Sequence, residues 1–353
     1  MHFTKKRMNF SNRLVFWYLQ NKRDLPWRTT LNPYHIWLSE IILQQTRVDQ
    51  GMSYYLKFID QYPTIANLAA ASEEDVLKLW QGLGYYSRAR NLHATAKKIH
   101  FEYHGIFPSD YDELLKLKGI GDYTASAIAS ICFDLPTAVV DGNVFRFLAR
   151  YFNISTPINS TKGIKEFKQL AQELLDIEQP GTHNQAMMEF GARVCKPMAP
   201  DCDTCIFNTS CLARSKNKIK VLPVKLKKTK IVKKYFNYLV IETGNHSTFI
   251  HKRVEGIWKN LYEFPLINSE NELQISELIE HPEFLDIVGD DKVSIQLFND
   301  EQVVHKLSHQ HLYTKFWIIK SKVVSPFSHP WNSIDKFPVP TLIHNFLKQY
   351  KNN

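Results

Sequence analysis

The sequence has no long hydrophobic run. None of its apolar stretches approaches the roughly 20 residues that a helix needs to span a bilayer, and the stretch MHFTKKRMNFSNR lacks the uninterrupted apolar core of a secretory signal. These absences argue against membrane-embedded and secreted proteins. We therefore expect a protein without a membrane partner, located in the cytoplasm.

Cysteine is scarce, with five residues in a chain of 353. Cys132 lies alone in an apolar stretch with helical periodicity, whereas the other four are close together in a hydrophilic segment with the spacing C-x6-C-x2-C-x5-C: Cys195, Cys202, Cys205 and Cys211. In a reducing compartment this grouping indicates metal binding rather than disulfides. Four thiolates in a short loop suit an iron–sulfur cluster, while structural zinc sites more often use two C-x2-C pairs. We predict the cluster, with zinc as the alternative.

Acidic residues are outnumbered by basic ones, and the formal net charge is +9. A positive net charge favours binding to a polyanion. Between Arg214 and Lys234 there is no acidic residue, and lysines accumulate there at positions 216, 218, 220, 225, 227, 228, 230, 233 and 234. We interpret this segment as a linker between domains. Its lysines are either a solvated charge run or a strap along DNA phosphates, and both alternatives stay open.

The hydrophobic pattern changes along the chain. Up to Ala213, helical periodicity dominates, with segments such as Tyr34–Ile59 separated by turn residues. From Tyr235 onward, several segments rich in β-branched and aromatic residues predict strands, with helical patterns at Asn271–Glu280 and Thr341–Tyr350. The length allows two domains that each bury a core. We predict a multidomain protein with an all-α domain (1–213), a basic linker (214–234) and an α+β domain (235–353).

The segment Leu114–Phe152 combines a glycine hairpin with an isolated aspartate. Gly119 and Gly121 bracket one apolar residue, which lets the backbone turn sharply and bring N–H groups close to a phosphate. Asp141 follows an apolar run at an expected helix N-terminus, where the helix dipole favours a carboxylate. Taken alone, the hairpin is an ordinary turn between helices and Asp141 is an N-cap.

In combination, the hairpin LKGIG (117–121), the segment VDGNV (140–144) and the cysteine spacing resemble the adenine DNA glycosylase (MutY) family of the helix-hairpin-helix superfamily, which also contains endonuclease III. The resemblance covers almost the whole chain. It implies a helical domain with a [4Fe-4S] cluster on the four clustered cysteines, followed by a domain that resembles MutT, a Nudix protein. The implied partner is double-stranded DNA with adenine opposite 8-oxoguanine or guanine. We accordingly expect a monomer that is associated with the nucleoid if the protein is bacterial.

The resemblance assigns the chemistry of a DNA glycosylase to three residues. Asp141 matches the catalytic aspartate, whose charge stabilises an oxocarbenium-like sugar, and Asn143 matches a residue that supports it by hydrogen bonding. Glu40 matches the general acid that protonates adenine. Its helix is mostly apolar, and desolvation there raises the pKa of a carboxyl group.

Tyr123 distinguishes between relatives. It lies two residues after the second hairpin glycine, where bifunctional glycosylases carry a Schiff-base lysine. A phenol cannot form that imine, so we expect a monofunctional hydrolase in which Tyr123 lines the pocket beside the sugar.

Further residues match contacts to DNA in the family. Extrusion of a base leaves a gap that side chains fill. The matching residues are Gln45, wedged into the duplex; Leu83 and Tyr85, near the opposite base; Gly119 and Gly121, clamping a phosphate beside Lys118, which replaces the usual proline; and Trp27 and Arg28, near the adenine pocket.

The C-terminal part matches the second domain of the family. The segment GIWKNLYEFP (256–265) resembles its G-L-W-x-x-L-x-x-F-P motif, and the magnesium-binding Nudix motif G-x5-E-x7-R-E-x-x-E-E is absent from the sequence. We expect this domain to bind a base without hydrolysing nucleotides. Ser308 and His309 match the loop that probes 8-oxoguanine, with Leu307 in place of the family's phenylalanine. A structural role for this Ser-His pair is the alternative.

Three other functions fit the sequence less well. An endonuclease III-like glycosylase/AP lyase is disfavoured by Tyr123 and by the long second domain. A non-catalytic iron–sulfur DNA-binding protein is disfavoured by the presence of both Glu40 and Asp141. A nucleotide-pool hydrolase would need the Nudix motif.

Overall fold

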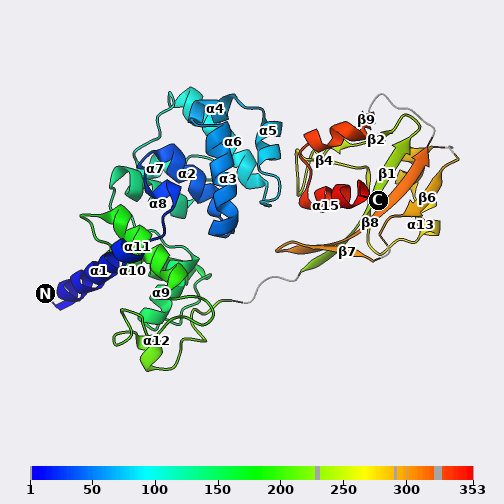
Figure 1. Cartoon of the computed structure of the whole chain (residues 1–353). Coiled ribbons are helices and arrows are strands. Elements are labelled where there is room, and N and C mark those ends of the chain that lie inside the picture. The colour runs from blue at the N-terminus through cyan, green and yellow to red at the C-terminus, as the bar shows by residue number, and fades with distance from the viewer. Residues whose placement is uncertain (1, 227–230, 290–291, 300, 322–327, 353) are drawn as a thin grey trace. The chain divides into compact units, whose positions relative to one another are not determined.

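The computed structural model describes residues 2–226, 231–289, 292–299, 301–321 and 328–352 (Figure 1). The predicted linker lysines at 227, 228 and 230 lie outside these residues. The chain folds into two compact units: a first unit, Met1–Ala70 with Asn91–Lys227, and a second unit, Ala71–Arg90 with Lys228–Asn353. The domain boundaries drawn from the sequence, after residues 213 and 234, stay a prediction.

The first unit is helical. Its short helices begin at capping residues such as Asn32, Asp110 and Ser160, whose side chains accept a backbone N–H of the first turn. The helices are α1 (His2–Asn21), η1 (Pro26–Arg28), α2 (Pro33–Leu43), α3 (Val48–Gln61), α4 (Ile65–Ala70), α6 (Ser87–Glu102), α7 (Tyr111–Leu115), α8 (Asp122–Phe133), α9 (Gly142–Tyr151), α10 (Thr161–Leu174), α11 (Pro180–Arg193) and α12 (Leu212–Ser215).

The prediction of one continuous helix over Tyr34–Ile59 is wrong. The structure has two helices, α2 and α3, separated by a turn in which Gln45 has a left-handed backbone (φ +56°). A residue with positive φ cannot continue a right-handed helix. The break could not be recognised in the sequence because apolar periodicity continues on both sides of this turn. Gln45 is exposed in the turn.

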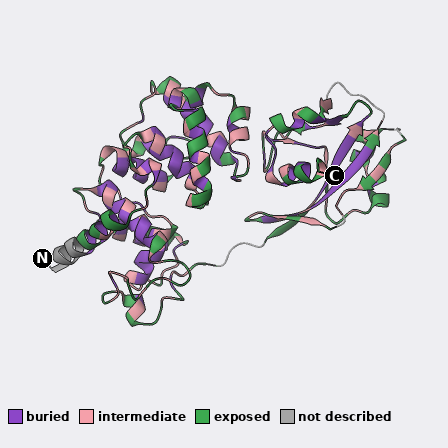
Figure 2. Cartoon of the chain, viewed as in Figure 1, coloured by how far each residue is buried: buried purple, intermediate pink, exposed green. Residues whose placement is uncertain are grey.

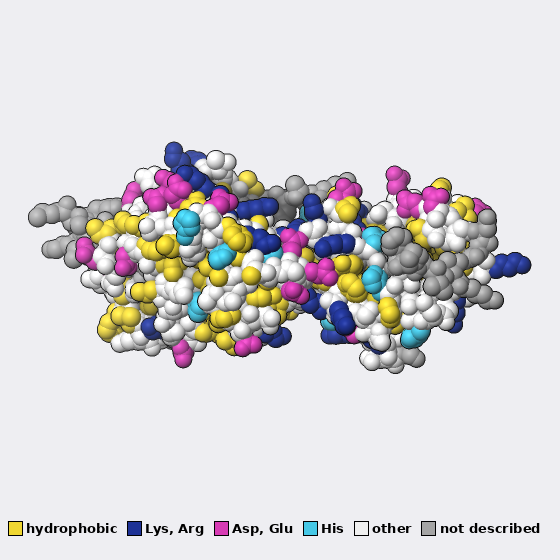
Figure 3. Space-filling view, turned by 90° about the horizontal axis from the view of Figure 1, so that it is seen from above, with side chains coloured by type: hydrophobic (Ala, Val, Ile, Leu, Met, Phe, Trp, Pro, Cys, Tyr) yellow, Lys and Arg dark blue, Asp and Glu magenta, His cyan; other side chains and the backbone are white. Residues whose placement is uncertain are grey.

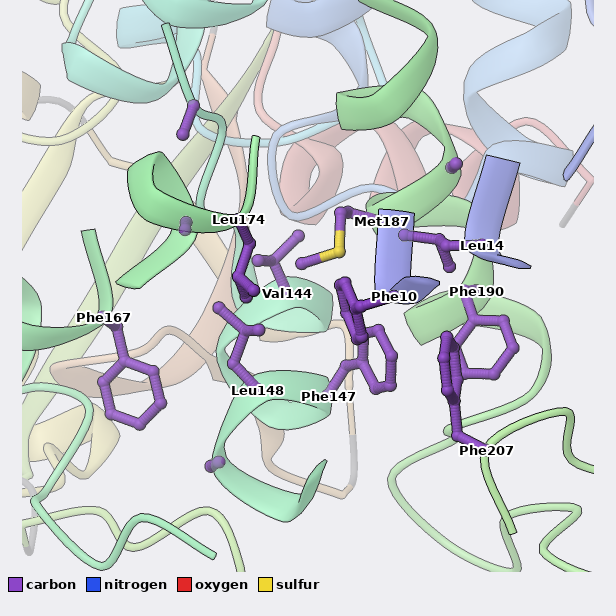
Figure 4. Packing of buried hydrophobic residues seen from close by; sticks show 14 of the residues in the cluster. Phe10, Leu14, Val144, Phe147, Leu148, Phe167, Leu174, Met187, Phe190 and Phe207 are labelled. Atoms are coloured by element: carbon purple, nitrogen blue, oxygen red, sulfur yellow. The ribbon is translucent and has the colours of Figure 1, made fainter. Parts of the chain in front are cut away.

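Four helices of the first unit enclose an aromatic core. Val144, Phe147 and Leu148 of α9 are spaced as one helix face, and Figure 4 shows them among side chains of α1, α10 and α11. The ring of Phe147 lies 4.7 Å from that of Phe190. Burying one such side chain contributes about 1.5–3 kcal/mol. This packing fixes α9, and therefore also the residue that caps its N-terminus, Asp141.

The second unit is α+β. Its elements are α5 (Glu73–Leu79), β1 (Val232–Thr243), β2 (Ser247–Phe249), β3 (His251–Lys252), β4 (Tyr262–Glu263), β5 (Leu266–Ser269), α13 (Ile275–Ile279), α14 (Pro282–Val288), β6 (Ser294–Leu297), β7 (Val303–Lys306), β8 (Gln310–Ser321), β9 (Ser328–Pro330), η2 (Trp331–Lys336) and α15 (Thr341–Tyr350). The helix predicted at Thr341–Tyr350 is confirmed, whereas the one predicted at Asn271–Glu280 is confined to α13.

The centre of this unit is the parallel pair β1 and β8, within a sheet of order β6-β8-β1-β2-β9 that β5 and β7 extend. The middle of each strand, Phe236–Ile241 and Thr314–Ile319, is buried (Figure 2), as is typical of parallel strands that are covered on both faces. Leu239 and Trp317 lie in a cluster with residues of α13 and α14. Phe316 stacks on Phe346 of α15, on the opposite face. The second unit therefore has helices on both faces of its sheet.

Charged side chains are interspersed with apolar ones on the face drawn in Figure 3. Within the part of the chain that the structure describes, no helix combines the length and the apolarity needed to cross a membrane.

Candidate active site

Glu40 lies on α2, a helix whose neighbouring residues Leu38, Ile41 and Ile42 are buried. Glu40 itself is only 9% exposed. Its Oε2 accepts a hydrogen bond of 2.5 Å from the hydroxyl of Tyr123 on α8. Burial raises the pKa of Glu40 to about 7, and the nearby Asp141 adds to the rise, while the Tyr123 hydrogen bond opposes it. Near neutral pH, this carboxyl group is therefore divided between its acid and base forms.

Asp141 is the N-cap of α9. Its Oδ1 accepts the backbone N–H of Asn143 (2.9 Å) and of Val144 (2.7 Å), and its Oδ2 accepts the side-chain amide of Asn143 (2.6 Å). Burial raises the pKa of Asp141, but these three donors and the charge of Arg146 oppose the rise. The charged form of Asp141 is thus hydrogen-bonded on both oxygens, whereas Tyr123 is the one hydrogen-bond donor to Glu40 among the described residues.

One cavity of about 840 Å³ in the first unit brings the two carboxyl groups together. Most of the site residues predicted from the sequence of this unit line it: Trp27, Arg28, Glu40, Gln45, Tyr123, Asp141 and Asn143. The cavity therefore contains a buried carboxyl group and a hydrogen-bonded carboxylate, and paired carboxyl groups of this kind can cleave a glycosidic bond.

Two residues of this cavity were missed in the sequence. The carboxylate of Glu189, on α11, is fully buried and accepts hydrogen bonds from Arg23 (2.6 Å) and Arg28 (2.7 Å). Burial alone would raise the pKa of Glu189, but these two arginines lower it to about 2. The sequence feature that could have identified Glu189 is an acidic residue in the apolar run MMEF, and the same feature marks Glu40.

Arg146 was missed as well. It is buried on α9 and donates to the side chain of Asn143 (2.8 Å) and to the carbonyls of Gly191 and Cys195 (both 2.7 Å). It therefore joins the partner of Asp141 to the beginning of the cysteine segment. No local pattern in the sequence distinguishes it from other arginines.

The glycine hairpin is exposed at the start of α8. Gly119 has φ +81°, and an added Cβ would lie 2.7 Å from Cβ of Asn91. Gly121 is the N-cap of α8, and the hydroxyl of Thr95 holds the carbonyl of Lys118 at 2.7 Å. The turn needs glycine at position 119 both for its backbone angle and for space.

The four clustered cysteines line a small cavity of about 30 Å³ beside α9. The guanidinium of Arg150 lies 3.5 Å from Sγ of Cys195, and the backbone N–H of Phe207 lies 3.4 Å from Sγ of Cys205. Donors of this kind stabilise thiolates, so the sulfur atoms and their surroundings fit an iron–sulfur group. No three His, Cys, Asp or Glu side chains among the described residues converge on a point that would hold one metal ion.

The other predicted residues lie in the second unit. Ser308 and His309 are exposed in the tight turn between β7 and β8. They line a cavity of about 410 Å³ together with Leu83, Tyr85 and Trp258. Tyr85 is 49% exposed, whereas the side chain of Leu83 is nearly covered (7%).

Each half of the chain matches a known protein family. Residues 38–175 match the family model of the HhH-GPD superfamily base excision DNA repair proteins, and residues 237–349 match the NUDIX domain model. Residues of this chain superimpose on a thermostable thymine-DNA glycosylase with a TM-score of 0.56, at 29% identity over 60% of this chain and 98% of that one. Superposition on an endonuclease III–DNA complex gives a TM-score of 0.53 at 21% identity, over 60% of this chain and 97% of that one. The predicted fold class is confirmed.

Curated relatives extend over both halves. The chain is 36% identical to an adenine DNA glycosylase of Buchnera aphidicola subsp. Baizongia pistaciae over 89% of this chain and 87% of that protein. It is 32% identical to one of Buchnera aphidicola subsp. Acyrthosiphon pisum over 98% of each. The Homo sapiens adenine DNA glycosylase is 44% identical over 59% of this chain and 40% of its own length.

Proposed function

The chain belongs to the adenine DNA glycosylase family, and on this premise we propose that it excises adenine that is mispaired with 8-oxoguanine or guanine in DNA. The observation that supports this most is the pair of carboxyl groups in one cavity with different surroundings. Glu40 is buried with one donor and has a pKa near 7, while Asp141 accepts three hydrogen bonds.

In the proposed reaction, the adenine is extruded from the duplex into the cavity. Glu40 in its acid form gives its proton to a ring nitrogen of adenine, which makes the base a better leaving group. Tyr123 holds the carboxyl group of Glu40 in place. Arg28 and Glu189, which are paired with each other at 2.7 Å, line the same cavity.

As the glycosidic bond breaks, positive charge develops on the sugar. The Asp141 carboxylate stabilises this charge through space until water adds. Because its own three hydrogen bonds fix the carboxylate, little reorganisation is needed when the charge appears. Asn143 is the supporting residue.

DNA is proposed to bind along the first unit through the hairpin and the corner at Gln45. The exposed turn at Gly119 and Gly121 can present backbone N–H groups to a phosphate. Gln45, raised on its left-handed turn at the rim of the cavity, fills the gap left by the extruded base.

The base opposite adenine is proposed to be read by the cavity of the second unit. Ser308 and His309 supply polar groups there, and Tyr85 supplies an exposed ring for stacking. Leu307, in place of phenylalanine, supplies less apolar surface.

The four cysteines are proposed to hold a [4Fe-4S] cluster. Such a group supplies no step of a base hydrolysis; it would crosslink the segment from Cys195 to Cys211, whose basic neighbours Lys196 and Arg214 would then face DNA. Iron and sulfide analysis of the purified protein should give about four of each per chain. One zinc per chain would contradict the proposal.

The substitution Asp141→Asn tests the mechanism. It removes the charge but keeps the size of the side chain, so base release should fall by about a hundredfold to a thousandfold while the mismatched duplex is still bound. Single-turnover release of adenine and a binding titration measure the two effects. Asp134→Asn, the same change at an exposed position, is the control. Full activity in Asp141→Asn would refute the assignment.

Four duplexes test the substrate. Adenine opposite 8-oxoguanine and opposite guanine should be excised faster than adenine opposite cytosine or thymine. Equal rates on all four would contradict the proposed role of the second unit.

The alternative activity, a glycosylase/lyase, has its own test. Borohydride should trap no protein–DNA adduct, because Tyr123 cannot form an imine. A trapped adduct would favour the lyase.

A further inference from the structure

The turn that carries Tyr85 has an unusual backbone. It joins α5 to α6, and three of its residues have left-handed backbone angles: Gly82 (φ +104°), Gly84 (φ +71°) and Tyr85 (φ +48°). Glycine adopts such angles freely, but a residue with a side chain does so only when its surroundings hold it. Something in the structure must therefore hold Tyr85 in this conformation.

Arg88, at the start of α6, contacts the turn from inside. It is 9% exposed. Its guanidinium lies 4.9 Å from the ring centre of Trp80 and 5.9 Å from that of Tyr85. It also donates to the carbonyls of Gly84 (3.2 Å) and Leu83 (3.4 Å). One planar group thus contacts four residues of the turn.

Two further hydrogen bonds complete this arrangement. The indole N–H of Trp80 donates to the carbonyl of Gly84 (3.1 Å), and the backbone N–H of Arg88 donates to the carbonyl of Tyr85 (2.9 Å). Burial lowers the pKa of Arg88 to about 10. Placing a cation in a covered position costs free energy unless hydrogen bonds and ring faces compensate.

We propose that Arg88 is a positioning residue that holds the Leu83–Tyr85 turn ready to receive the base opposite the excised adenine. This inference rests on the proposed function of the cavity that Tyr85 and Ser308 line. By fixing two carbonyls and one face of the Tyr85 ring, Arg88 leaves the exposed part of that ring in a set orientation. Stacking on a ring that is already ordered loses less conformational entropy on binding.

The experiment compares Arg88→Met, Tyr85→Ala and the double variant. The measured quantity is the ratio of single-turnover base-release rate constants for adenine opposite 8-oxoguanine and opposite cytosine. Arg88→Met should lower this ratio about tenfold, because loss of one base–aromatic stack lowers affinity by roughly that factor. In the Tyr85→Ala background, Arg88→Met should lower it by less than about twofold, because residues acting through one contact are not additive.

Two variants serve as controls. Arg88→Lys keeps the charge over the rings but loses the planar fork, so its ratio should lie between those of the wild type and Arg88→Met. Lys97→Met removes a cation from an exposed position of the same helix and should keep the wild-type ratio. If Arg88→Met does not fold, Trp80→Phe replaces it. That variant removes one donor to Gly84 and should lower the ratio in the same direction.

An unchanged ratio in folded Arg88→Met, or full additivity with Tyr85→Ala, would overturn the inference. The proposed function fails separately, and visibly, if the wild type releases no adenine from any duplex.

Discussion

At the scale of single residues, the site depends on how two carboxyl groups in one cavity are hydrogen-bonded. Burial raises the pKa of both Glu40 and Asp141. Asp141 accepts three hydrogen bonds and Glu40 accepts one from Tyr123. Hydrogen bonds to a carboxylate favour its charged form, and this difference supports the roles proposed above, charge stabilisation for Asp141 and proton donation for Glu40.

Glu40 predicts a pH dependence. In the proposed mechanism Glu40 acts in its protonated form, and its pKa is about 7. Adenine release under single-turnover conditions should therefore decrease as pH rises through about 7 and level off below it, until protonation of Asp141 lowers the rate again. Glu40→Gln should remove the dependence near 7 together with most of the activity. A rate that is constant between pH 6 and 8 would argue against Glu40 as the acid.

Tyr123→Phe should shift the pH dependence of adenine release. The phenol donates to the Glu40 carboxylate and lowers its pKa. Without it, the pKa should rise by about one unit, since a hydrogen bond of about 1.4 kcal/mol corresponds to one pKa unit. The midpoint of the rate–pH profile should shift upward. Tyr103→Phe, outside the cavity, should leave the midpoint unchanged, and a downward shift in Tyr123→Phe would contradict the assignment.

At the scale of elements, the position of Asp141 depends on how α9 and α11 approach each other. Gly191 of α11 lies against the backbone of Asn143, so that an added Cβ would be 2.7 Å from the carbonyl oxygen of Asn143. Arg146 spans the same contact by donating to both residues. The apolar face of α9 is buried in the core shown in Figure 4, so α9 cannot move away without losing that packing.

Gly191→Ala should therefore affect both stability and catalysis. The methyl group meets backbone atoms, which cannot rotate away, and overpacking of this kind costs about 1–3 kcal/mol. Chemical denaturation should show the loss in unfolding free energy, and base release by the folded variant should be slower. Gly244→Ala, where nothing lies within 4 Å of the added Cβ, is the matched control. Equal stability of the two variants would mean that α11 can shift freely.

At the scale of the whole molecule, the second unit is assembled from two separate stretches of chain. Gln81 follows α5, and its amide accepts the N–H of Val339 (3.2 Å) and donates to Nδ1 of His344 (2.9 Å). Burial lowers the pKa of His344, which keeps Nδ1 available as an acceptor. The hydroxyl of Tyr86 donates to the carbonyl of Val339 (3.2 Å). The turn carrying Tyr85 is thereby attached to the same unit as Ser308 and His309.

Gln81→Ala should loosen this attachment. The Val339 N–H loses its acceptor, and because such a hydrogen bond is worth about 1 kcal/mol, amide hydrogen exchange across residues 337–344 should become several-fold faster. Mass spectrometry of peptides measures it. Gln349→Ala, at an exposed position of α15, should not change the exchange. Unaltered exchange in Gln81→Ala would show that the contact contributes little.

Much of the fold class could be predicted from the sequence because its signals are local. Helical periodicity, the change to strand-like segments after Tyr235, the paired glycines and the cysteine spacing each depend on residues within a few positions of one another. Glu40 could be singled out because an acidic residue in an apolar helix is costly without a reason. The break between α2 and α3 could not be predicted, because the apolar periodicity continues across the turn at Gln45.

The sequence by itself determined the order of the two architectures in the chain, and its local patterns pointed to most of the residues proposed for the site. Only the tertiary structure decided which groups meet. Glu40 meets Tyr123 from 83 positions away, and Glu189 meets Arg23 from 166. The segment Ala71–Arg90 joins a unit whose remainder begins at Lys228. The physical reason is that a periodic pattern reports which face of an element is buried, whereas its partner is chosen by packing among all the faces available at once.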